Sequence, residues 1–190
     1  MRKRMNVRKT VALVAAAMLA ALLGGCRAGT PQIVGGEVAG PENENSAAFL
    51  DRVSSLDTVS ENDACRGVIL LLDGEDARPD FAARVRALRE RDVVGHWNMD
   101  ASAPVTRGRL AYMIYQATDM PGGLILAAFG PSERYCLREL QYRGIMVDGL
   151  GNTQISGMEY VAVLRRADAY TRTGEFPDST GGLYAGRGTP

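Results

Sequence analysis

Few residues of this chain could do chemistry. It has one histidine, His96, and three cysteines, Cys26, Cys65 and Cys136. A serine or cysteine nucleophile activated by histidine would have to use His96, and no Gly-x-Ser-x-Gly elbow is present. The metal-ligand spacings His-Glu-x-x-His and Cys-x-x-Cys are also absent. We therefore expect no enzyme activity, no catalytic residue, no metal site and no cofactor, and we expect His96 to be a partly exposed loop residue.

Cys26 follows a segment of the secretory type. Basic residues between Arg2 and Lys9 precede an apolar run, Val11 to Leu23, that is too short to span a bilayer stably. Leu23-Gly24-Gly25-Cys26 resembles a bacterial lipobox. This resemblance implies that residues 1–25 are a signal peptide and that Cys26 becomes the first residue, carrying acyl chains such as palmitate. It implies an exported protein held to a bacterial membrane by lipid, at the outer membrane or cell surface if the cell has two membranes.

Removal of the signal peptide changes the charge balance. The whole chain has 22 basic and 22 acidic residues, but five basic residues and no acidic one precede Cys26. The remaining negative charge argues against nucleic acid as a partner. Cys65 and Cys136 then remain in an exported protein. The compartment permits a disulfide between them, and their spacing leaves both the bonded and the free state open.

Composition divides the mature chain into three parts. Residues 26–46 are rich in Gly, Pro, Asn and Glu, which predicts a flexible linker behind the lipidated cysteine. Residues 171–190 are rich in Gly, which predicts a disordered tail. Residues 47–170 show helical periodicity and predict one folded domain.

Three segments of that domain share the start of a capped helix. In each, a β-branched apolar residue precedes a hydroxyl residue suited to the N-cap. The clearest is Val105-Thr106, because Leu110 can close a hydrophobic staple with Val105, and Met113 continues the apolar face. The other two are Val59-Ser60 and Ile155-Ser156.

A second pattern precedes each capped helix. Apolar residues recur at i, i+4 and i+7 from Phe49 and again from Phe81, and a weaker copy includes Leu137 and Leu140. A first helix, a connector and a capped second helix thus occur three times. The sequence predicts an all-α fold, in which three tandem helix-loop-helix repeats form a compact pseudo-threefold bundle over residues 47–170.

The apolar segment Leu124 to Phe129 lies between the second and third repeats. It could be a short strand, a helical turn laid over the core or a patch that faces a partner. Of these we favour a place in the core.

The stretch Pro104 to Ala111 resembles the start of the second helix in the S-layer homology (SLH) domain. Leu137, Leu140 and Gly144-Ile145-Met146 resemble that family's first helix and its end. The resemblance implies an all-helical bundle that binds secondary polymers of the cell wall. It also implies that Thr106 and Arg107 carry the ligand-binding motif, with Arg107 meeting the anionic sugar ketal.

Two functions follow as expectations. The first is a non-catalytic binding or structural module of the cell envelope that binds wall polysaccharide through SLH-like repeats. The alternative is a scaffold subunit of an envelope complex that keeps the repeats, has lost the sugar site and binds another protein. In both, the lipid at Cys26 makes the membrane a partner, and nucleic acid is excluded.

Overall fold

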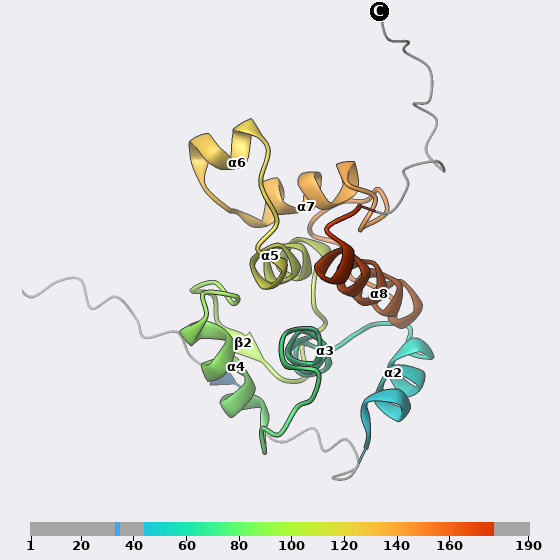
Figure 1. Cartoon of the computed structure of the whole chain (residues 1–190). Coiled ribbons are helices and arrows are strands. Elements are labelled where there is room, and N and C mark those ends of the chain that lie inside the picture. The colour runs from blue at the N-terminus through green and yellow to red at the C-terminus, as the bar shows by residue number, and fades with distance from the viewer. Residues whose placement is uncertain (1–32, 35–43, 177–190) are drawn as a thin grey trace, which may run out of the picture. The chain divides into compact units, whose positions relative to one another are not determined.

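The computed structural model describes residues 33–34 and 44–176. The predicted signal peptide, the lipidation site Cys26 and residues 177–190 lie outside the described residues. In the described part, the all-α prediction is confirmed, since seven helices account for most of the chain (Figure 1). They are α2 (Ser46–Ser54), α3 (Glu61–Asp73), α4 (Phe81–Glu90), α5 (Arg107–Thr118), α6 (Leu124–Phe129), α7 (Glu133–Tyr142) and α8 (Gly157–Thr173).

Six of these helices begin at a polar side chain that caps them. Each capping oxygen accepts a hydrogen bond from a backbone N–H three residues later, which satisfies a donor that the first turn leaves free. The caps are Asn45, Ser60, Asp80, Thr106, Ser132 and Ser156. The predicted helix starts at Ser60, Thr106 and Ser156 are therefore confirmed.

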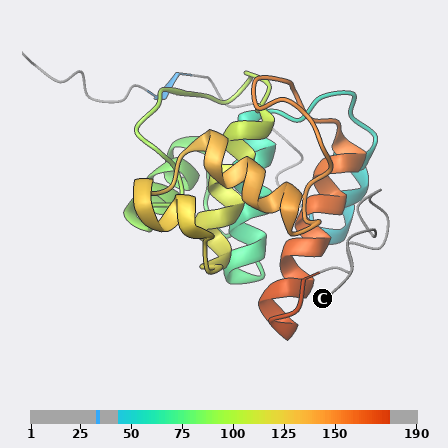
Figure 2. The same cartoon turned by 90° about the horizontal axis from the view of Figure 1, so that it is seen from above.

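The second helices of the three predicted repeats, α3, α5 and α8, contact one another at the centre of the bundle (Figures 1 and 2). The first helices lie outside them. The main contacts of α2 are with α8, those of α4 with α3 and those of α7 with α5. Each first helix thus packs against the second helix of another repeat, as a closed arrangement of three repeats requires.

Backbone hydrogen bonds join the three segments that lead into the central helices. At the first residue of each helix, the N–H donates to a carbonyl in the segment before another central helix. The pairs are Glu61 with Ala103 at 2.8 Å, Arg107 with Thr153 at 2.9 Å and Gly157 with Leu56 at 2.9 Å. These three hydrogen bonds therefore link the first repeat to the second, the second to the third and the third to the first. This arrangement agrees with the predicted pseudo-threefold bundle.

The linker is more ordered at two places than its composition predicted. Ile33–Val34 (β1) pairs in parallel with Met99–Asp100 (β2). The Glu44 carboxylate forms ion pairs with Arg52 at 2.9 Å and with Arg66 at 2.8 Å, and its side chain is only 4% exposed. The composition of the linker could not show these contacts because the partner residues lie outside the linker.

The last helix runs further than predicted. Helix α8 ends at Thr173, and Gly174 at φ 71° accepts the left-handed conformation that closes it. The Phe176 ring then stacks on Tyr170, with 4.5 Å between ring centroids. The tail boundary predicted at residue 171 is therefore too early by several residues.

The expected core position of the segment Leu124 to Phe129 is wrong. The segment forms the short helix α6, of which only Leu126 is buried, while Leu124 is 91% and Phe129 74% exposed. No helix in the described part of the chain has the length and apolar character needed to cross a bilayer.

Candidate functional site

Thr106 and Arg107, the residues predicted to bind a sugar, lie at the start of α5. The Thr106 hydroxyl accepts a hydrogen bond from the Arg109 N–H at 3.3 Å and so acts as the helix cap. The Arg107 guanidinium is turned inward. It is paired with the Glu159 carboxylate at 2.5 Å and donates to the Val147 carbonyl at 3.1 Å.

This pairing leaves little of Arg107 for a ligand. Its side chain is 12% exposed and that of Glu159 is 18% exposed. Gly149 lies directly against the guanidinium, since a Cβ there would stand 2.7 Å from Nη1. A sugar carboxylate could reach Arg107 only by displacing an internal carboxylate that is already in place.

Glu61 and Arg109 form a related pair between the first and second repeats. The Arg109 guanidinium is paired with the Glu61 carboxylate, which also accepts the Asp100 N–H at 2.8 Å. In both pairs, the first residue of one central helix meets the third residue of the next. Sequence reasoning missed these pairs because their members are 48 and 52 residues apart.

At the third junction this charge pattern is absent. Gly157 occupies the first position of α8, and the corresponding acid, Asp63, pairs with Arg52 of α2 at 2.9 Å. The missing side chain at Gly157 lets the α8 backbone approach the Val53 carbonyl of α2 closely. The third junction thus depends on backbone contact with α2 instead of on a direct ion pair between central helices.

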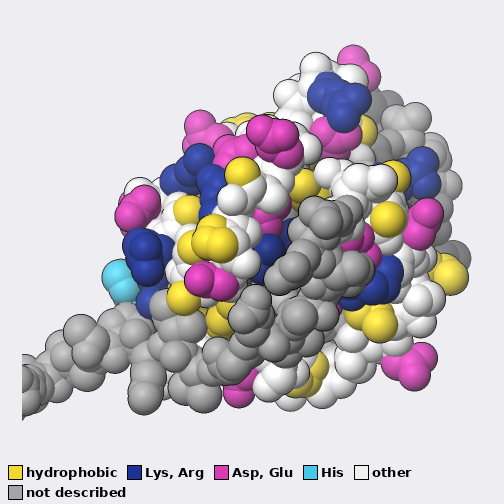
Figure 3. Space-filling model, turned by 90° about the horizontal axis from the view of Figure 1, so that it is seen from below, with side chains coloured by type: hydrophobic (Ala, Val, Ile, Leu, Met, Phe, Trp, Pro, Cys, Tyr) yellow, Lys and Arg dark blue, Asp and Glu magenta, His cyan; other side chains and the backbone are white. Residues whose placement is uncertain are grey.

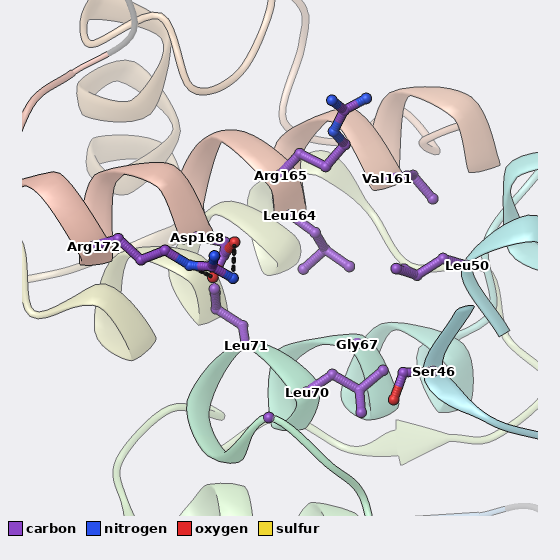
Figure 4. Close-up of a pocket in the computed structure, with 11 residues that line it drawn as sticks. Ser46, Leu50, Gly67, Leu70, Leu71, Val161, Leu164, Arg165, Asp168 and Arg172 are labelled. Carbon is purple, nitrogen blue, oxygen red and sulfur yellow. Dashed lines mark hydrogen bonds and ion pairs between the residues drawn. The ribbon is translucent and has the colours of Figure 1, made fainter. Parts of the chain in front are cut away.

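A groove opens between α2, α3 and α8 (Figure 4). Its volume is about 300 Å³. Most of its lining is apolar, and the apolar side chains are Leu50, Leu70, Leu71, Val161 and Leu164. We call this the α2–α3–α8 groove. Local sequence patterns could not predict this groove, because its walls come from the first and third repeats.

Charged side chains border this groove on the α8 side. Asp168 and Arg172 form an ion pair at 2.8 Å that lies beside Leu71 (Figure 4). Arg165 is exposed and forms no hydrogen bond or ion pair within the described part of the chain. Within the described residues, the groove therefore combines an apolar floor with one unpaired positive charge, that of Arg165, at its border.

The side chains that the sequence analysis considered for catalysis or metal binding do not form a site in the described part of the chain. His96 is exposed, as predicted. Within residues 33–34 and 44–176, no three His, Cys, Asp or Glu side chains cluster in a way that could hold a metal ion. The face seen from below mixes positive and negative side chains without a large patch of one sign (Figure 3).

The two cysteines of the folded domain are free and buried. The disulfide that the sequence left open is therefore not formed in this structure. Burial raises the pKa of the Cys136 thiol to about 12, and it also raises the pKa of the Cys65 thiol. Neither thiol is a ready nucleophile, because only the thiolate reacts.

Comparison with known proteins adds no assignment: no protein-family model, no curated protein and no solved structure matches this chain. The resemblance to the SLH domain therefore depends on the sequence positions themselves, mainly the stretch Pro104 to Ala111.

Proposed function

We propose that this chain is a non-catalytic lipoprotein of the cell envelope that binds a partner protein in the α2–α3–α8 groove. The observation that carries the proposal is the contrast between two places on the molecule. Arg107, the predicted ligand residue, is paired internally with Glu159, whereas the groove is open and Arg165 at its border has no partner among the residues that the structure describes.

The chemistry of the groove favours a protein segment over a sugar. Its floor of leucine and valine side chains offers apolar contact, and burying such surface is the main favourable term in protein association. Its volume of about 300 Å³ would hold a few apolar side chains of a partner. Arg165 would meet an acidic residue of the same segment.

Wall polysaccharide is the second candidate. The closed arrangement of three repeats supports it, since it is the architecture that the SLH resemblance implies. Against it stands the Arg107–Glu159 pair, with which a sugar carboxylate would have to compete.

Site-specific photocrosslinking in the native host tests the protein-binding proposal. A crosslinking amino acid would replace Leu71 in the groove or, as a control, the exposed Arg86 on α4. We expect one discrete protein adduct from position 71, none from position 86, and loss of the adduct in the variant Arg165→Glu. Equal adducts from both positions, or an adduct indifferent to Arg165→Glu, would refute the proposal.

Sedimentation with purified wall sacculi tests the polysaccharide candidate. Glu159→Gln removes the charge that holds Arg107, so sugar binding through Arg107 should become stronger in this variant and be lost in Arg107→Ala. If neither variant changes sedimentation, Arg107 has no role in wall binding.

A further inference from the structure

Helix α6 presents an apolar surface without any charge. Leu124 is 91%, Phe129 74% and Ile125 50% exposed. The sequence from Met120 to Ser132 contains no charged side chain. Single exposed apolar residues are common on proteins, but three large ones on one short helix need a reason.

Helix α7 packs against α6, with the Tyr135 ring 6.1 Å from the Phe129 ring, and carries exposed basic and aromatic side chains. Arg134 and Arg138 are both exposed and stand one helical turn apart. Neither forms an ion pair within the described residues. Tyr142 follows one turn later and is 81% exposed. Of the two acids on the same helix, Glu139 is paired with Arg143 at 2.9 Å, and Glu133 is the first residue of the helix.

We propose that α6 and this exposed face of α7 dock on an anionic lipid surface. The apolar side chains of α6 would enter the boundary between headgroups and acyl chains, and Arg134 and Arg138 would meet lipid phosphates. Tyr142 is of the residue type that favours the membrane–water boundary. The acids nearest to this face are Glu133, at the start of α7, and the paired Glu139.

A bilayer explains this surface better than a second protein does. A stable protein interface buries about 800 Å² on each partner and has a polar rim with paired hydrogen-bond groups. The exposed side chains of α6 are fewer than such an interface needs, and none of them has a polar atom. A lipid interior needs no polar partner, and flanking arginines are the usual complement to anionic headgroups.

The docking would orient the domain. Helices α6 and α2 lie on opposite sides of the central helices in both views (Figures 1 and 2). With α6 on the membrane, the α2–α3–α8 groove would face away from it, toward partners in the envelope. The proposed lipid at Cys26 would keep the domain close to the membrane. At this high local concentration, even a weak contact between α6 and the bilayer can form. The docking surface is distinct from the groove, so either proposal can fail while the other stands.

Tryptophan quenching by brominated lipids tests the docking. The full chain would be reconstituted in vesicles of brominated phosphatidylethanolamine and phosphatidylglycerol, with a tryptophan added by Leu124→Trp or, as a control, by Arg86→Trp on α4. Wild-type protein supplies the baseline from Trp97. We expect clear additional quenching and a blue shift for Leu124→Trp and none for Arg86→Trp.

Removing the positive charges of α7 gives a second test of the docking. In the Leu124→Trp protein, Arg134→Gln and Arg138→Gln should each weaken this insertion about fivefold, and neutral phosphatidylcholine should weaken it as well. Equal quenching for positions 124 and 86 would overturn the proposal. A blue shift at position 124 that appears only when envelope proteins are added would also overturn it and would assign α6 to a protein partner.

Discussion

At the scale of single residues, two helices end in the same backbone conformation although a different residue type occupies that position. Gly144 after α7 and Asp92 after α4 both have positive φ, 71° and 57°. Their N–H groups donate to the carbonyl three residues earlier, and the next residues donate five residues back. Glycine is the residue type expected at such a helix end, and aspartate takes this conformation less readily because it has a Cβ.

This equivalence predicts a stabilising substitution. Asp92→Gly should raise the free energy of unfolding by about 0.5–1 kcal/mol, because glycine adopts positive φ without steric cost. Gly144→Ala is the matched test at the other site and should lower it by about 1 kcal/mol. Urea denaturation followed by circular dichroism would measure both. A loss of stability in Asp92→Gly would mean that the aspartate side chain itself stabilises this turn.

Asp73, the last residue of α3, gives a pH-dependent contribution. Arg91 and then Arg78 donate hydrogen bonds to its carboxylate and lower its pKa in the folded state. The unfolded pKa is about 3.9, so the stabilisation is fully present above that pH and is lost as the pH falls through the folded value.

Asp73→Asn should therefore lower the free energy of unfolding at pH 7 by about 0.5–1 kcal/mol, the usual size for a partly exposed pair. The difference from wild type should shrink toward zero as the pH falls through the lowered pKa of Asp73 in the folded state. The exposed Asp57→Asn is the control and should show no such trend. Thermal unfolding between pH 2 and 7 would give the comparison, and a difference that grew in acid would contradict the assignment.

At the scale of elements, the packing of α2 against α8 depends on one glycine. A Cβ at Gly157 would overlap the Val53 carbonyl and approach the Leu56 nitrogen. Backbone atoms cannot move aside as a flexible side chain can, so α2 would have to separate from α8.

Gly157→Ala should accordingly lower the free energy of unfolding by about 2–3 kcal/mol. Gly108 in the first turn of α5 is the matched site, where a Cβ would lie 3.0 Å from the movable Glu133 carboxylate and 3.1 Å from the Gly151 carbonyl oxygen, contacts that a shift of a few tenths of an ångström relieves. Gly108→Ala should lower the free energy of unfolding by less than about 1 kcal/mol. Chemical denaturation of the two variants side by side would show the difference, and equal losses would argue against close backbone contact at Gly157.

At the scale of the whole molecule, ion pairs couple the repeats to one another. The Arg107–Glu159 pair joins the second repeat to the third, and both side chains are mostly buried. Removing either partner leaves a buried charge unpaired, which costs more than the pair itself contributes.

Arg107→Ala should lower the free energy of unfolding by about 1–3 kcal/mol, and Glu159→Ala should do the same. The double variant should lose less free energy of unfolding than the two single variants lose together, because the second substitution removes the charge that the first left unpaired. A double-mutant cycle in urea measures this coupling. Strictly additive losses would show that the two side chains do not stabilise each other.

The sequence by itself determined the local features of this protein. The caps at Ser60, Thr106 and Ser156, the helical periodicity and the all-α class each depend on residues within a few positions of one another, where backbone geometry and hydrogen bonding act directly. The repeat of these features along the chain was visible for the same reason.

Only the tertiary structure decided how these features are used. It paired Arg107 with Glu159 and Glu61 with Arg109, left Cys65 and Cys136 free and exposed α6 instead of burying it. Each of these outcomes depends on which distant side chains meet when the repeats close on one another. A charge or an apolar residue has the same local signature whether it ends in an ion pair, in the core or at the surface, so its role is settled by packing.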